Sequence, residues 1–245
     1  MTERNTLAPI VIEGAMDCEM SHIIGALSDA HTYSFCGYPV TEGKLGDMTV
    51  VAALNQVGMV NAACLTSLLI QRYSPLCVVS QGTAGSYSAE LKTGDVILGK
   101  EIRNINCINM RPDDCRRLEE LSGGEWLEMQ AFSSDSRLAD IAEKVPYAYG
   151  NIIKGSIASC DFWSYDAERI HEIRARFGSD CEEMETFAAA QVCRRMDVPF
   201  LSIRVISNNE LSGEGFSAEA ALRCQEYTLD VVRAIAAEHE KTEGK

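Results

Sequence analysis

The sequence is poor in positive charge and in histidine. Its 245 residues include 22 lysines and arginines against 36 aspartates and glutamates, which gives a formal net charge of −14, and only 4 histidines. Binding to nucleic acid or to an anionic membrane surface needs clusters of basic side chains, which this composition does not supply. The expected partner is therefore a small molecule, and neither a nucleic acid nor a membrane.

Long hydrophobic runs and metal-binding patterns are also absent. No stretch of about 18 or more apolar residues occurs, and the opening MTERNTLAP lacks the apolar core of a signal peptide, so we expect a soluble cytoplasmic protein. The ten cysteines include no C-x-x-C pair and are expected to be reduced thiols. Cys18 and His22 have no second pair at ligand spacing, which argues against a metal. Neither G-x-G-x-x-G nor G-x-x-x-x-G-K-[ST] is present, so we expect no cofactor.

Short apolar runs alternate with helical patterns along the whole chain. Strands are predicted at residues 8–14, 32–38, 38–45, 48–56, 93–104, 151–159 and 201–210, a strand that passes into a loop at 76–86, and helices at 17–30, 59–74, 137–145, 167–177, 181–196 and 217–239. Continuous Val, Ile and Leu runs indicate an α/β fold with three αβα layers, in which a mostly parallel or mixed sheet is covered on both faces. No Pro/Gly/Ser linker divides the chain, so residues 1–245 are predicted to form one domain.

Four segments of small or polar residues follow predicted strands, at residues 14–19, 81–86, 160–164 and 207–215. In open α/β sheets, ligands bind where the carboxyl ends of the strands meet. We therefore expect these four segments, read as loops, to form the candidate site.

Each notable residue in these segments can be interpreted in two ways, as having a structural role or as binding or acting on a ligand. Glu13, Asp17 and Glu19 surround a Gly-Ala turn, where acidic side chains also stabilise the first turn of a helix. The same two interpretations apply to the acids of CEEMETFAAAQV, residues 181–192. The segment QGTAGS offers backbone N–H groups to an anion or a sugar oxygen, or it forms a plain turn. Trp163 is either a core aromatic or a platform for a base.

The order of these motifs resembles that of the nucleoside phosphorylase superfamily, and within it the 5′-methylthioadenosine/S-adenosylhomocysteine nucleosidases. EGAMDCEM is similar to the family's G-A-M-x-x-E, and GTAGS followed by LKTGDV is similar to its G-[ST]-A-G-G and L-x-x-G-D-[IV] signature. EEMET matches E-M-E-[AG] except at its last position, and VPFLSIRVIS matches the strand that carries the catalytic acid. The resemblance implies a twisted mixed sheet partly closed into a barrel, in a chain that assembles as a homodimer.

The resemblance also implies roles for the matching residues. Glu19 takes the position of the general base that activates the attacking water, and Glu185 that of the carboxylate on the ribose hydroxyls. Trp163 falls at the aromatic that stacks on the purine. The other positions at the nucleoside are Met16, Val57, Thr83, Ala84, Gly85, Glu183, Met184, Arg204, Ser207 and Phe216, of which Arg204 and Ser207 would orient the neighbouring turn and the catalytic side chain.

One catalytic position departs from the family pattern. After IRVIS the pattern has an aspartate that protonates the departing purine, whereas this chain has Asn208. An amide can donate and accept hydrogen bonds, but it cannot transfer a proton. Losing a general acid typically costs about 10²–10⁴ in rate.

Three interpretations of Asn208 remain open. In the first, the enzyme acts on 6-oxopurine nucleosides, against whose base the trimeric purine nucleoside phosphorylases use asparagine. In the second, it still cleaves adenine nucleosides, either slowly or with Glu210 as the acid, since residues 208 and 210 of an extended strand point to the same side. The third is a non-catalytic nucleoside-binding protein, as some plant storage relatives are. An engineered Asp-to-Asn change also fits the sequence.

The segment that would face the sugar favours hydrolysis over phosphorolysis. Phosphate needs cationic partners, and this segment presents Asp17 and Glu19 without an arginine. The sequence thus predicts a nucleosidase of the methylthioadenosine/S-adenosylhomocysteine type, with altered base specificity or reduced activity. Residues 107–134, where related dimers build the neighbour contact and the pocket for the 5′ substituent, have no pattern that predicts that substituent.

Overall fold

The computed structural model describes residues 8–126, 128–209 and 211–243, and Glu210, a candidate acid, lies outside them. The strands are β1 Ile10–Gly14, β2 Ser28–Phe35, β3 Tyr38–Leu45, β4 Met48–Leu54, β5 Cys77–Ser86, β6 Val96–Asn104, β7 Ala131–Phe132, β8 Ile152–Ser159, β9 Cys181–Glu183 and β10 Phe200–Asn209. The helices are α1 Asp17–Gly25, α2 Met59–Tyr73, α3 Pro112–Leu121, α4 Ser136–Glu143, α5 Ala167–Phe177, α6 Thr186–Arg195 and α7 Ala218–Glu243, with 3₁₀ turns at η1 Asn106–Asn109 and η2 Glu128–Gln130.

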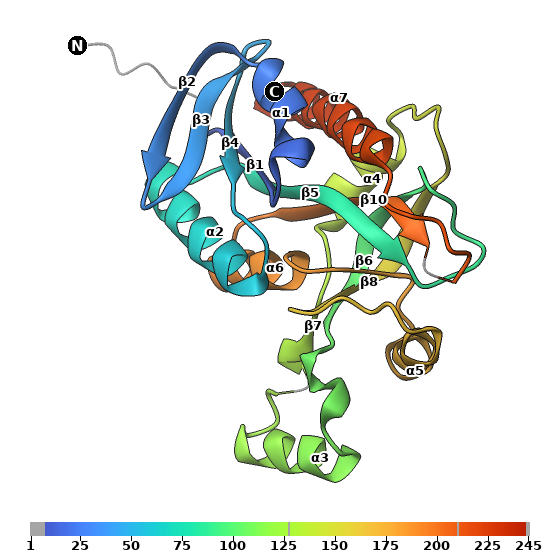
Figure 1. The fold of residues 1–245 in the computed structure, drawn as a ribbon. Helices are drawn as coiled ribbons and strands as arrows, with labels where there is room; N and C mark the ends of the chain where they lie inside the picture. The colour runs from blue at the N-terminus through green and yellow to red at the C-terminus, as the bar shows by residue number, and fades with distance from the viewer. Residues whose placement is uncertain (1–7, 127, 210, 244–245) are drawn as a thin grey trace.

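Strand β5 closes part of the sheet into a barrel. It pairs in parallel with β1 and β10 and antiparallel with β9, while β6 connects β10 to β8 and β8 connects to β9. The strands β10, β6, β8, β9 and β5 therefore form a ring, from which β1, β4, β3 and β2 extend as an open sheet (Figure 1). The predicted α/β fold, with a mixed sheet partly closed into a barrel, is confirmed.

Helices cover both faces of the sheet. α2 packs with α6 on one face and α1 packs with α7 on the other (Figure 1). Ile10 and Ile12 of β1 join the core on the α1 and α7 side, whereas Val11 between them joins the core on the α2 and α6 side. Because successive side chains point to opposite faces and both faces are buried, β1 reads as a continuous apolar run. No helix of the described residues is long and apolar enough to span a membrane.

The helix predicted at residues 17–30 is too long. It ends at Gly25, and Ser28 begins β2, which pairs with β3. Residues 26–30 suit a helix locally, so the strand partner decides their conformation. Residues 81–86, predicted as a loop, are the end of β5.

The helix predicted at residues 181–196 also begins too early. Cys181–Glu183 form strand β9 between β5 and β8, and α6 begins at Thr186. The acids of this segment are therefore not the first turn of a solvated helix. Side chains on a strand alternate between its two faces, so Glu182 and Glu183 face different surroundings.

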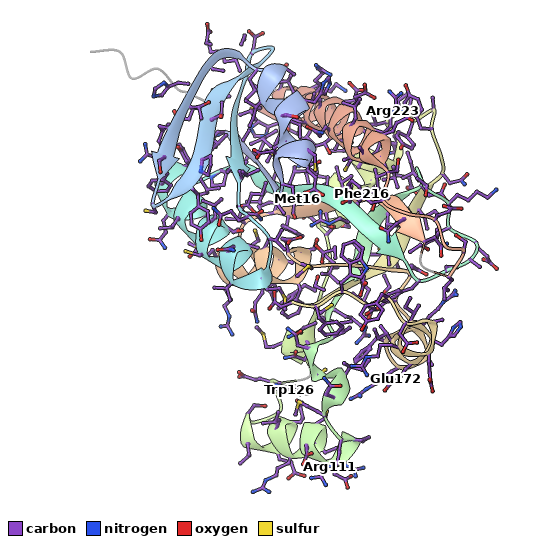
Figure 2. All side chains as sticks on the ribbon, viewed as in Figure 1. Met16, Arg111, Trp126, Glu172, Phe216 and Arg223 are labelled. Atoms are coloured by element: carbon purple, nitrogen blue, oxygen red, sulfur yellow. The ribbon has the colours of Figure 1, made fainter. Side chains whose placement is uncertain are left out.

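A projection, residues 105–130, leaves the sheet between β6 and β7. It contains α3, which lies apart from the body of the protein (Figure 1). Arg111 and Trp126, labelled in Figure 2, belong to this projection. No residue of α3 is buried within the chain.

The carboxyl group of Glu13, near the end of β1, is buried between the sheet and α2. Glu13 of β1 is fully buried; Thr66 Oγ1 of α2 donates to its Oε2 at 2.8 Å, and its Oε1 has no hydrogen-bond partner. Burial raises the pKa of Glu13 to about 8, although the bond from Thr66 opposes this shift. Glu13 is therefore a neutral carboxylic acid at pH 7.

We predict that Glu13→Gln removes a loss of stability at high pH. The folded-state pKa of about 8 lies above that of an exposed glutamate, so the folded protein holds this proton more tightly than the unfolded chain. The resulting stabilisation is complete below the unfolded pKa and is lost as the pH rises through about 8. Urea unfolding should show wild type losing roughly 2–4 kcal/mol more than the variant between about pH 5 and pH 9. Equal losses in the two proteins would contradict this assignment.

Candidate active site

A cavity of about 400 Å³ lies at the carboxyl ends of β1, β5 and β10, a volume within the range of small-molecule sites. Its lining residues are Ala15, Met16, Cys18, Glu19, Val57, Thr83, Ala84, Gly85, Phe162, Trp163, Glu182, Glu183, Met184, Glu185, Ser207, Asn208 and Phe216. All four predicted segments contribute, and every predicted site residue except Arg204 lines the cavity. A larger open groove of about 1010 Å³, around the start of β10, contains none of them.

Glu19 lies in the first turn of α1 with its carboxylate against β5. Its Oε1 accepts from the backbone N–H and the hydroxyl of Thr83, at 2.8 and 2.9 Å. Its Oε2 accepts from the N–H groups of Ala15 and Met16, both at 3.2 Å. A Cβ at Gly82 would lie 2.9 Å from Oε1, so this close approach needs glycine. Four donors thus hold the carboxylate in one orientation at the cavity wall.

Glu183 and Arg204 form an ion pair beneath the cavity, with both side chains only 2% exposed. Arg204 donates from Nη2 at 2.8 Å and from Nε at 3.2 Å to Oε2 of Glu183. Glu183 also accepts from the hydroxyls of Ser159 and Thr186 and from the N–H of Glu185. Burial opposes ionisation, but Arg204 and the hydroxyl donors hold the pKa of Glu183 below its ordinary value. This network fixes the turn before α6.

Glu185 ends that turn and directs its carboxylate toward α2. Oε1 accepts from the N–H of Gly58, at the start of α2, at 2.8 Å. Burial, and then the negative charge of Glu183, raise the pKa of Glu185 to about 8. Two carboxyl groups two residues apart therefore differ in charge at pH 7: Glu183 is ionised in its ion pair with Arg204, and Glu185 is mostly protonated.

A β-bulge positions Asn208. Ile206 pairs with Ala84 and Asn208 with Gly85, so Ser207 is an extra residue in β10. Ser207 Oγ donates to Asn208 Oδ1 at 2.8 Å, a contact that neighbours on opposite faces of a regular strand would not make. The amide nitrogen lies 3.3 Å from the place a Cβ of Gly85 would take. The bulge thus directs the Asn208 amide toward β5 at the cavity.

Large apolar side chains border the cavity mouth. Trp163 is 54% exposed, Phe216 49% and Val57 47%. Met16, before α1, and Phe216, after β10, are labelled in Figure 2. Exposed aromatic groups around an apolar cavity are typical of a site for a flat ligand. In the described part of the chain, no group of three or more His, Cys, Asp and Glu side chains could hold a metal ion.

Four lining residues were not predicted: Ala15, Cys18, Phe162 and Glu182. Ala15 and Phe162 adjoin predicted residues, so their neighbours were a usable signal. The sequence shows Glu182 as one of three acids before α6. Because Glu182 and Glu183 lie on strand β9, their side chains point in opposite directions, which the sequence alone does not show. Arg204, predicted among the nucleoside positions to orient the neighbouring turn, does not line the cavity; it lies beneath it and bonds to Glu183 of that turn.

Comparison with known proteins agrees with this geometry. Residues 9–237 match the sequence model of the phosphorylase superfamily. The chain is 32% identical over 234 residues to the 5′-methylthioadenosine/S-adenosylhomocysteine nucleosidase of Bacillus thuringiensis (strain Al Hakam), covering 92% of this chain and 99% of the relative. The crystal structure of the Neisseria meningitidis nucleosidase in complex with methylthio-immucillin-A has a TM-score of 0.78 at 26% identity, covering 93% of this chain and all of that one.

A futalosine hydrolase of Helicobacter pylori has the same fold, with a TM-score of 0.76 at 20% identity over 93% of this chain and 98% of that one. At this identity only the fold is comparable. The sequence match extends over nearly the whole chain, through all the strands that build the cavity. The chain therefore belongs to the phosphorylase superfamily.

Proposed function

We propose that this protein is a purine nucleosidase, which hydrolyses the N-glycosidic bond of nucleosides of the 5′-methylthioadenosine/S-adenosylhomocysteine type. The observation that supports it most is the pairing of Glu19 and Glu185 at one aromatic-rimmed cavity, with the amide of Asn208 at the same wall. The curated relatives at 32% identity have this activity in their name. The Neisseria meningitidis relative binds methylthio-immucillin-A.

Glu185 is suited to the ribose end of such a substrate. Cleavage of a glycosidic bond passes through an oxocarbenium-like sugar, which a nearby carboxylate stabilises. Glu185 is mostly protonated in the empty cavity because its pKa is about 8. Two ribose hydroxyls that donate to it would favour the ionised form. Nucleoside binding is therefore expected to drive a proton off Glu185.

Glu19 is suited to activate the water. The 2.8 and 2.9 Å bonds from Thr83 fix Oε1, while the two 3.2 Å bonds to Oε2 are the longer ones. A water that replaces one of these longer bonds would have its proton directed at Oε2. As its oxygen bonds to C1′, the C1′–N9 electron pair moves to the purine and the water proton moves to Glu19.

The purine end has no proton donor at residue 208. The Asn208 amide can stabilise a departing base by hydrogen bonds, but the base must take its proton from solvent. This limits adenine release, which depends on protonation of the ring. It favours a second candidate, the hydrolysis of 6-oxopurine nucleosides of the inosine, methylthioinosine or futalosine type, because their carbonyl oxygen accepts from an amide N–H.

We also propose that the chain acts as a homodimer. The projection, residues 105–130, supports this, because its helix α3 buries no residue within the chain. A second copy would supply the missing contact. Sedimentation of the purified protein measures its oligomeric state and so tests this proposal.

Incubation with methylthioadenosine, methylthioinosine, inosine and futalosine, each with and without phosphate, tests the function. Free base released without phosphate is the expected result. Strict dependence on phosphate would show a phosphorylase instead. If no substrate releases base while nucleosides bind by calorimetry, the protein is a binding module and the enzyme proposal is wrong.

Asn208→Asp is expected to raise adenine release by about 10²-fold or more, because it restores a group that can protonate the purine. The measurement is kcat/KM on methylthioadenosine. Asn109→Asp is the control: Asn109 is exposed and does not line the cavity, and its amide oxygen accepts from Arg169 Nη2 at 2.9 Å, a bond that a carboxylate keeps. Unchanged adenine release in Asn208→Asp would show that this position is not the missing acid.

Glu19→Gln is expected to lower the hydrolysis rate by about 10²–10⁴ while nucleoside affinity changes little. Glutamine keeps an oxygen for the two Thr83 bonds, but it cannot accept the proton of the water. Single-turnover rates and calorimetric Kd values separate the two effects. Asp17→Asn, an exposed acid in the same helical turn, should leave both unchanged. Lost affinity in Glu19→Gln would indicate a structural role instead.

A further inference from the structure

Glu182 lines the cavity, yet the nucleosidase mechanism gives it no role. It lies on β9 and is only 8% exposed. Its Oε1 accepts from the N–H of Ser164 at 2.9 Å, and the Tyr87 hydroxyl donates to its Oε2. Ser164 directly follows Trp163, the aromatic at the mouth. The Glu182 carboxylate is thus held beside the end of the cavity where a base would stack.

The strand register sets Glu182 opposite Asn208. Gly85 of β5 pairs with Glu182 on one side and with Asn208 on the other. Directly paired residues project to the same face of a sheet, and neighbouring strands lie about 4.8 Å apart. Glu182 and Asn208 therefore flank the space that the missing side chain of Gly85 leaves, with Cα atoms about 10 Å apart. The Asn208 amide takes up part of this space, with its nitrogen 3.3 Å from the place of a Gly85 Cβ, so a flat base whose edge faces Gly85 meets a polar group on each side.

Glu182 and Asn208 differ in the hydrogen bonds that they can form with a base. Both oxygens of Glu182 accept hydrogen bonds, from the Ser164 N–H and the Tyr87 hydroxyl, whereas the Asn208 amide can both donate and accept. Burial, and then the charge of Glu182, raise the pKa of Tyr87 above its ordinary value, so its phenol stays protonated and donates to Glu182. The cavity therefore offers an acceptor on the β9 side and a donor with an acceptor on the β10 side.

Purines differ at the edge that would face these groups. A 6-oxopurine presents N7, a carbonyl oxygen and N1–H in sequence, whereas adenine presents N7, an amino group and a bare N1 that accepts. An adenine N1 opposite a carboxylate would place two acceptors together, and a buried acceptor without a donor is costly. A site built to receive an N–H discriminates strongly against a ligand that lacks it.

We propose that Glu182 is a specificity-determining residue that accepts from N1–H of a 6-oxopurine, while Asn208 faces N7 and the 6-oxo group. The cavity then selects hypoxanthine- or guanine-type bases over adenine, which favours the second candidate function, the hydrolysis of 6-oxopurine nucleosides, over the release of adenine. This choice of base rests on the proposed nucleosidase function only for the placement of the sugar at Glu19 and Glu185. In this proposal the asparagine at position 208 suits the base of the substrate, so it does not imply a loss of activity.

Base binding tests this on the unaltered protein. Calorimetry with hypoxanthine, 1-methylhypoxanthine and adenine compares three ligands that differ at N1 and C6. Hypoxanthine should bind at least about tenfold more tightly than either of the others, because each lacks the N1–H donor. Equal affinity for hypoxanthine and its 1-methyl form would overturn the proposal.

Glu182→Gln tests the residue itself. It should lower hypoxanthine affinity, and kcat/KM on inosine-type nucleosides, by about tenfold to a hundredfold, and should leave adenine binding unchanged or improved. Glu172→Gln, an exposed position on the covering helix α5 labelled in Figure 2, is the matched control and should change neither. A parallel loss for both bases in Glu182→Gln would mean that Glu182 only anchors the loop at Ser164, which overturns the proposal.

The two proposals fail in distinguishable ways. If nucleosides are hydrolysed but hypoxanthine is not preferred to adenine, Glu182 does not set the base and the nucleosidase proposal stands. If hypoxanthine binds preferentially and depends on Glu182 while no nucleoside is hydrolysed, the base assignment stands and the nucleosidase proposal falls.

Discussion

The buried ion pair between Arg204 and Glu183 is the interaction on which the site depends. Arg204 also donates to the carbonyl oxygen and the hydroxyl of Ser80, so one guanidinium joins β10, β5 and β9. Through Glu183 the same network holds Thr186 and the start of α6. Removing one partner would leave an unpaired buried charge, which costs about 3–5 kcal/mol. The turn that carries Glu185 therefore has one position, set from below the cavity by charge and not by packing around the ligand.

Carboxyl groups of one chemical type have different states here because their surroundings differ. Glu183 has a cation and several donors and is ionised, whereas Glu13 has one hydroxyl donor and retains its proton. Glu185 lies between these cases, since one backbone N–H does not offset burial and the neighbouring charge. A ligand that brings hydroxyl groups can change the charge of Glu185 but not that of Glu183. A ligand can therefore change the charge of Glu185 at the cavity wall, while the charges of Glu183 and Arg204 stay the same.

The sequence predicted most of the cavity because its lining lies at the ends of buried strands, which local patterns identify. That the four segments meet at one edge of the sheet could be predicted without knowing the strand register. The direction of the Glu182 side chain could not be predicted, because it depends on the pairing of β9, and neither could the burial of Arg204 in an ion pair beneath the cavity. The bulge at Ser207 is likewise a product of pairing with β5. Helix α1 was extended too far for the same reason, since only contact with β3 shows that Ser28 begins a strand.

Trp163 gives the protein an optical property. The chain has two tryptophans, and the other, Trp126, lies on the projection away from the cavity (Figure 2). Trp163 is about half exposed to water at the cavity mouth. Indole emission depends on the polarity around the ring, so a base stacked on Trp163 would shift and quench its fluorescence. The two indole rings therefore lie at separate places, one at the cavity mouth and one on the projection, where each is exposed to a different set of possible contacts.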